Sequence, residues 1–422
     1  MFKTLRNALK IEDIRKKLIF TFLMLVVVRF GSQLPIPGAN RDYFQAWFAQ
    51  QTGDAFNFFD AFTGGSFTSM SLFALGITPY ITSSIIVQLL TIAIPKLEEM
   101  QKDGEDGRKK ISSYTRYLTV ALAVIQAIGI TLSYRTMFVS SSKLMLICSV
   151  LTLVSGSTFI MWLAEQITNK GITNGSSMII FVNIVSNLPT GITSLIYYAQ
   201  GDNVSGIVKV AIVLILMLAV IIFIVVIHEG ERRIPVQYSA KMVGRRSFGG
   251  KSTFMPIKVS TAGVLAIIFA ISLVQFPETL SQFFTPGPTF QKVIEALKLT
   301  SPIGAVLYMV LIIFFAYFYT SITFNPLEVA DNIKKQGGFI PGIRPGKPTS
   351  DYLTNILNYI IFIGAVGLII VCVIPFIFNG VFGANVSFGG TSIIIVVGVI
   401  LETVKQIESQ LLVRNYKGFL NN

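Results

Sequence analysis

The sequence predicts an all-α polytopic membrane protein with ten transmembrane helices. Of its 422 residues, 52% are hydrophobic and only 13% are charged, whereas soluble domains usually carry about 25% charged residues. The apolar stretches are long, and they lack the residue-by-residue alternation of a transmembrane β-barrel strand. Hydrocarbon offers no partner for a free backbone N–H or C=O, so helices remain as the way for this chain to cross a bilayer.

Ten apolar stretches are long enough to span the hydrocarbon, which takes roughly 20 helical residues. They lie near residues 18–34, 72–94, 114–134, 144–166, 176–198, 207–227, 259–277, 303–324, 353–378 and 391–411. The first stretch has no small-residue cleavage site after it, so we expect it to stay in place as an anchor. Ten spans can form two five-helix halves, one over residues 1–200 and one over 201–422, and an inverted repeat of this kind leaves only weak traces in a sequence.

Lysine and arginine are distributed unevenly between the two sides of this arrangement. If the N-terminus is cytoplasmic, 27 of the 34 Lys and Arg residues fall on the cytoplasmic side, six fall on the other side, and Arg29 lies inside the first span. The positive-inside rule therefore predicts that both termini are cytoplasmic. Arg29 is near the outer end of its span, where we expect its side chain to reach the membrane interface.

Two of the expected cytoplasmic loops, residues 228–258 and 325–350, are too elaborate for simple connections. Both mix Arg and Lys with Gly, Pro and a few apolar residues. Such loops can form structured protrusions that bind an acidic partner or the phosphate backbone of RNA. The alternative is a basic topology determinant that touches anionic lipid.

The segment between the first two spans, residues 55–80, is apolar and aromatic but is interrupted by Gly64, Gly65 and Pro79. This pattern predicts a helix that starts, breaks and restarts at membrane depth. Irregular backbone at that depth is tolerated where protein or a water-filled cavity surrounds it. A re-entrant or interfacial segment without a gating role is the alternative.

Residues suited to catalysis or metal binding are scarce. The sole histidine, His228, begins a loop, and Cys148 and Cys372 lie in apolar stretches without metal or redox spacing. The glycine-rich stretch at 244–253 has the wrong spacing for a phosphate-binding loop. No relay of buried Asp, Glu or His marks a proton pathway. The sequence therefore predicts no enzyme and no cofactor, and it disfavours a secondary transporter of small solutes.

Several long motifs, in the right order, resemble those of the SecY family of protein-translocation channels. They are FTGGSFTSMSLFALGITPYITSSIIVQLL, GITNGSSMIIF, ERRIPVQYSAKMVGRR, KVSTAGVLAIIFA, FNPLEVADNIKKQGGFIPGIRPGKPT and FGGTSIIIVVGVILET. The resemblance covers essentially the whole chain. It implies an hourglass pore that passes unfolded secretory chains, between two pseudo-symmetric halves. A lateral gate between the second and seventh spans would release apolar segments into the lipid.

On the matching positions, the resemblance implies four sets of functional residues. The pore ring would consist of Ile77, Ile81, Ile180, Ile268 and Ile395, with Ile184 as the alternative on the fifth span. The plug would occupy residues 57–70, including Phe58, Phe59, Phe62, Gly64, Gly65 and Phe67. The lateral gate would include Gln88, Gln126 and Ser272. The loops that bind SecA or the ribosome would use Arg232, Arg233, Arg245, Arg246 and Arg344.

The resemblance also implies partners and a location. The partners would be SecE-like and SecG-like subunits, the SecA ATPase, the ribosome, signal peptides, unfolded preproteins and membrane lipids. The chain would lie in the bacterial plasma (inner) membrane. Two alternatives within membrane biogenesis stay open: an insertion scaffold without a continuous pore, and an accessory channel devoted to a few substrates.

Overall fold

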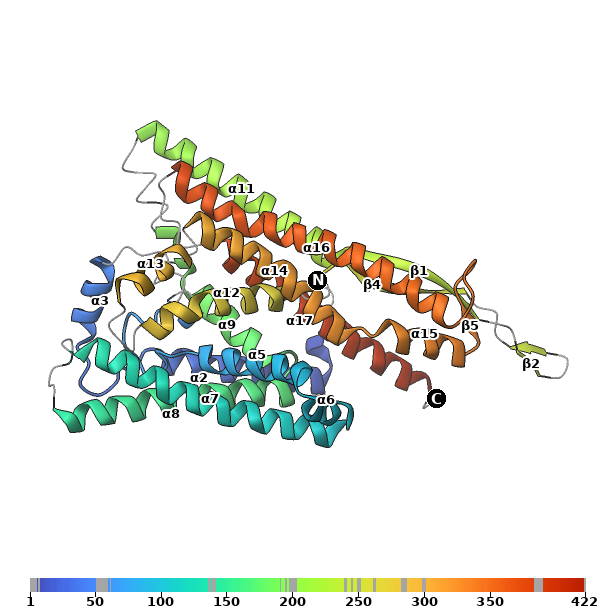
Figure 1. The fold of residues 1–422 in the computed structure, drawn as a ribbon, viewed down its shortest axis with the longest axis horizontal. Coiled ribbons are helices and arrows are strands. Elements are labelled where there is room, and N and C mark those ends of the chain that lie inside the picture. The colour runs from blue at the N-terminus through green and yellow to red at the C-terminus, as the bar shows by residue number, and fades with distance from the viewer. Residues whose placement is uncertain are drawn as a thin grey trace.

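The fold is that of a computed structural model of the chain. It describes residues 6, 8–50, 60, 62–135, 138, 142–189, 191–193, 196, 203–238, 241–243, 246–248, 252–260, 263–281, 287–297, 301–382 and 390–420. Long helices dominate it (Figure 1).

The first part of the chain forms a bundle around two long helices, α7 and α8, which pack against each other. Its helices are α2 (Glu12–Gly31), α3 (Arg41–Gln50), α5 (Thr78–Ala93), α6 (Pro95–Lys102), α7 (Glu105–Ser133), α8 (Lys143–Lys170) and α9 (Gly175–Ser186). α5 packs against α7, and α2 packs against both α8 and α9. The chain bends by 107° between α5 and α6. Pro95 explains this bend, because proline disfavours helical backbone in the residue before it, and Ile94 is extended.

The second part of the chain packs its helices around α14, α16 and α17. Its helices are α11 (Asn203–Glu229), α12 (Gly263–Ser281), α13 (Pro288–Leu297), α14 (Pro302–Thr323), α15 (Pro326–Lys335), α16 (Lys347–Phe382) and α17 (Gly390–Leu420). α12 packs against α14 and α17, and α11 packs against α16 and α17. The two parts meet where α12 contacts α5 and where α17 contacts α9.

A helix lies at each of the ten predicted spans, namely α2, α5, α7, α8, α9, α11, α12, α14, α16 and α17. Within the described residues, six helices are long and apolar enough to cross a membrane, and the bent pair α5–α6 would make a seventh. The predicted helical membrane fold is thus confirmed. The count of ten crossings and the division at residue 200 stay predictions.

Both long basic loops contain strands, which the sequence analysis did not predict. β1 (Glu231–Tyr238) pairs antiparallel with β4 (Ser252–Lys258) and with β5 (Gly338–Phe339), and β2 (Lys241–Val243) pairs with β3 (Arg246–Phe248). Ile234 and Val236 share one face of β1 and are buried, since successive side chains of a strand point to opposite faces. Because β5 comes from the second loop, the two loops form one structure, which we call the loop platform.

Figure 1 shows the loop platform and α15 at one end of the long axis, whereas α3 and α13 lie toward the opposite end. α6 lies at the end of its bundle that faces the platform. This arrangement agrees with the predicted alternation of loops between the two sides. The assignment of the platform side to the cytoplasm stays a prediction of the positive-inside rule.

Candidate channel and plug

The segment after the first span breaks at its glycines, as predicted. In the described part, residues 60, 62 and 63 are helical, and turns follow until α5 begins at Thr78. Gly64 and Gly65 have φ angles of +66° and +81°, a region that favours glycine. A Cβ on Gly64 would lie 2.6 Å from Nη1 of Arg29 and 3.0 Å from Cα of Asn183. Glycine at position 64 therefore serves both the turn and a close approach to two helices.

The aromatic side chains of the predicted plug pack in two different places. Phe62 packs against the large apolar cluster at the centre of the molecule. Phe67 is buried instead in an aromatic cluster at the end of the molecule where α3 lies, with ring centroids 5.2 Å from Phe48 and 6.3 Å from Tyr134. Phe58 and Phe59 lie outside the described residues.

Three side chains from neighbouring helices bind the backbone of the plug. Nη1 of Arg29, on α2, donates to the carbonyl of Gly64 at 3.0 Å. On α9, Nδ2 of Asn183 donates to the carbonyl of Phe62 at 2.9 Å. Asn187 comes directly after α9, and its Nδ2 donates to the carbonyl of Asp60 at 3.4 Å. Arg29 is half-buried and bonded to the plug, and its position relative to the membrane interface stays a prediction. The carbonyl of Gly64 follows a helical turn and has no partner within it, so it can accept a hydrogen bond from the guanidinium of Arg29.

The five isoleucines of the predicted pore ring belong to, or pack against, the large apolar cluster at the centre of the molecule. Four are buried, with exposed fractions of 3% for Ile77, 1% for Ile180, 4% for Ile268 and 0% for Ile395. Ile81 is partly buried and packs against the same cluster. They lie on α5 and at its N-cap, Ile77, and on α9, α12 and α17. α12 contacts both α5 and α17, and α17 contacts α9. Ile184 is also buried in this cluster, so burial does not distinguish it from Ile180.

The two helices of the predicted lateral gate, α5 and α12, contact each other. Gln88 on α5, Gln126 on α7 and Ser272 on α12 are all partly buried. The Oε1 atom of Gln88 is buried, and no hydrogen bond to it occurs among the described residues. Its amide is therefore incompletely satisfied in this arrangement of the helices.

The basic residues of the loop platform are solvent-exposed where the structure describes them. Arg232 and Arg233 are exposed on β1, and Arg233 pairs with Glu231 at 2.7 Å. Arg344 is exposed in the turn between β5 and α16, where its carbonyl accepts a 2.8 Å hydrogen bond from Oγ1 of Thr349. Arg246 lies on β3, and Arg245 lies outside the described residues.

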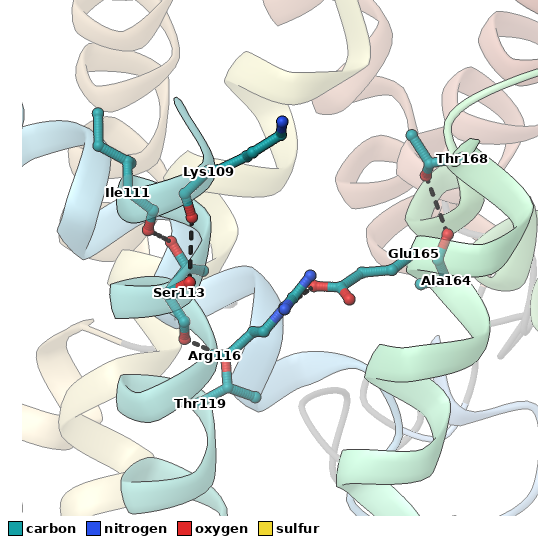
Figure 2. A network of polar contacts seen from close by, with 9 residues as sticks. Lys109, Ile111, Ser113, Arg116, Thr119, Ala164, Glu165 and Thr168 are labelled. Carbon is teal, nitrogen blue, oxygen red and sulfur yellow. Dashed lines mark hydrogen bonds and ion pairs between the residues drawn. The ribbon is translucent and has the colours of Figure 1, made fainter. Parts of the chain in front are cut away.

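An ion pair between α7 and α8 was not predicted from the sequence. Nε of Arg116 lies 2.7 Å from Oε1 of Glu165, whose side chain is only 15% exposed (Figure 2). Thr168 donates to the carbonyl of Ala164 next to it. Local sequence shows a charge near the end of each span, but it does not reveal which charges of two distant helices face each other.

Comparisons with known proteins agree with this geometry. The family model of SecY matches residues 71–404. The chain is 44% identical over 435 residues to protein translocase subunit SecY of Halalkalibacterium halodurans, with all of both chains covered. The chain belongs to the SecY family. It is likewise 44% identical over 438 residues to the SecY subunit of Bacillus subtilis and 43% identical over 442 residues to that of Streptomyces coelicolor, again over the full length of both chains.

Solved structures share the fold of this SecY family member. A structure described as a protein-conducting channel has a TM-score of 0.63 at 20% identity, covering 94% of this chain and 92% of the other. Sec61 in a canine ribosome–channel complex has a TM-score of 0.59 at 18% identity, with the same coverage.

Proposed function

We propose that this chain is the channel-forming subunit of a protein translocase. Unfolded secretory chains cross the membrane through its centre, and apolar segments leave sideways into the lipid. The observation that carries the proposal is that five isoleucines from four parts of the chain belong to, or pack against, the central apolar cluster of a member of the SecY family. The relatives that it matches over their full length are named protein translocase subunits.

The isoleucine ring closes the pore without a fixed binding site. An apolar constriction excludes water when it is empty, and ions cannot pass without water. Branched aliphatic side chains can change rotamer around a passing chain of any sequence, because they make no directional bonds with it. This behaviour suits a channel whose substrates share a backbone but no common side chain.

The plug, residues 57–70, is the second barrier of the closed channel. Its backbone is bonded to α2 and α9, and Phe62 packs against the cluster that contains the ring. One solved channel of this fold, at 20% identity and a TM-score of 0.64, is described as having a plug domain that stabilises the closed state and maintains a membrane seal. The same role for this segment agrees with its position.

The seam between α5 and α12 serves as the lateral gate. The buried Oε1 of Gln88 on α5 has no partner among the described residues, and it can gain one when the helices part and admit water or another chain. An apolar signal peptide can therefore compete for the seam with the contacts between the two helices.

Energy for transport comes from partners, since the sequence carries no catalytic constellation of its own. The exposed arginines of the loop platform, Arg232 and Arg344 among them, provide a surface for the SecA ATPase and for ribosomal RNA. Proteins of this fold have been solved in complexes with ribosomes, as with canine Sec61 and yeast Ssh1. SecE-like and SecG-like subunits complete the complex in the bacterial plasma membrane, with both termini of this chain in the cytoplasm.

Reconstitution tests this function against the alternative of a small-solute transporter. The chain with SecE-like and SecG-like subunits is placed in proteoliposomes with SecA, ATP and a secretory precursor. We expect the precursor to become protected from added protease, and Arg344→Ala to lose this protection while Lys347→Ala, also exposed nearby, retains it. An absence of protection with the unmodified chain, in vesicles of verified orientation, contradicts the proposal.

A further inference from the structure

Three carbonyls of one short turn, those of Asp60, Phe62 and Gly64, each accept a hydrogen bond from a side chain of another element. The donors are Arg29 on α2, Asn183 on α9 and Asn187, which caps the C-terminus of α9. Carbonyls at the end of a helical turn have no intrahelical donors. Here Asn183 and Arg29 supply donors to the carbonyls of Phe62 and Gly64. The carbonyl of Asp60 also accepts from the N–H of Gly65 and from Oγ1 of Thr63 within the turn, and Asn187 adds a further donor.

The position of Arg29 indicates a function beyond packing. Arg29 lies in the last turn of an apolar helix, and ionisable residues of transmembrane segments usually face a functional partner. Its partner here is a backbone carbonyl at a glycine, and a side chain at position 64 would collide with the guanidinium. Position 64 needs glycine for two reasons, the left-handed φ and the short distance to the guanidinium of Arg29. Both features bring the carbonyl of Gly64 against Arg29.

The two asparagines supply a second, independent observation. Asn183 lies in the last turn of α9 and Asn187 is its C-cap residue, four positions later, and both donate to the plug. Asn183 is 3% exposed, and its Oδ1 is buried without a hydrogen bond among the described residues. A buried amide that satisfies only its donor is less favourable than an apolar residue of the same size. The hydrogen bond from its NH₂ group to the plug therefore explains why an asparagine is buried at this position.

We infer that Arg29, Asn183 and Asn187 form a latch that holds the plug in the closed channel by its backbone. The inference rests on the proposed role of the plug. Because all three bonds are to carbonyls, the latch depends on the conformation of the turn and not on the side chains of the plug. All three bonds break when the plug leaves its site, so the latch sets the balance between the closed and open states.

Ion leakage from proteoliposomes that contain the complex, without SecA or precursor, tests the latch. A hydrogen bond to a charged donor contributes enough for Arg29→Leu to raise the open fraction, and with it the leak, by about ten- to a hundredfold. Arg29→Lys keeps a cationic donor and should restore part of the seal. Arg41→Leu is the matched control, because this exposed arginine bonds to Gln33 and not to the plug. If Arg29→Leu fails to assemble, Asn187→Leu tests the same prediction.

A deletion of residues 57–70 separates the latch from the plug. The deletion should leak, and Arg29→Leu should add nothing in that background, since its partner is gone. An equal increase with and without the plug shows that Arg29 stabilises the helices only and overturns the latch. A leaking deletion beside tight latch variants also overturns it, while the plug role stands. A deletion that does not leak overturns both.

Discussion

Replacement of Ile268 by asparagine should open the channel in the absence of a motor. Ile268 is 4% exposed in the apolar cluster that also holds Ile180 and Ile395. An amide buried there without a partner costs about 1–3 kcal/mol, whereas water solvates it once the pore is hydrated. The substitution therefore favours the open state by about 1–3 kcal/mol, which corresponds to a roughly 5- to 150-fold higher open fraction.

Ion conductance across planar bilayers measures this effect directly. Ile268→Val removes one methyl group and keeps the ring apolar, so it should conduct like the parent. Ile215→Asn places the same amide on α11, where the parent side chain is 67% exposed, and should also leave the conductance unchanged. A folded Ile268→Asn channel as tight as the parent, or a leak as large in Ile215→Asn, refutes the reasoning.

Three further predictions concern stability. Gly156→Ala should destabilise the chain by about 1–3 kcal/mol through overpacking, because a Cβ there would overlap the carbonyl oxygen of Leu72. Thermal unfolding in detergent measures the loss of stability. Gly287→Ala is the neutral control, because no atom lies within 4 Å of a Cβ at that position. Asn325→Ala removes the side chain that caps α15 and should weaken its first turn by about 0.5–2 kcal/mol; faster amide exchange there, absent in Asn332→Ala, supports the cap. Arg116→Met leaves the partly buried Glu165 unpaired and should lower the melting temperature more than the double variant Arg116→Met/Glu165→Leu; additive effects contradict the pairing.

The helices could be predicted because the signal for a span is local. Each of the ten apolar stretches contains a helix. The helical turn between the first two spans ends at Gly64 and Gly65, which have left-handed φ angles and follow the aromatic part of the segment. The five isoleucines are different. An isoleucine in an apolar span has the same local pattern whether it lines a pore or faces lipid, so the family resemblance was needed to select these five.

Contacts between distant segments could not be predicted from the sequence. β1 and β5 are about a hundred residues apart, and neither alone reveals its partner. The bonds from Arg29, Asn183 and Asn187 to the plug end on backbone carbonyls, which leave no complementary residue in the sequence. The one available signal was Arg29 itself, a charge inside an apolar stretch, and the sequence analysis assigned it to the interface.

Site-specific crosslinking of a stalled secretory precursor tests the central claim, that substrate passes through the isoleucine ring. A single cysteine is introduced as Ile81→Cys or Ile268→Cys after Cys148→Ser and Cys372→Ala, and Ile215→Cys on the exposed face of α11 is the control. During SecA-driven translocation, we predict crosslinks at both ring positions and none at the control. A translocating preparation that crosslinks at neither ring position contradicts the account and places the path of the precursor elsewhere in the bundle.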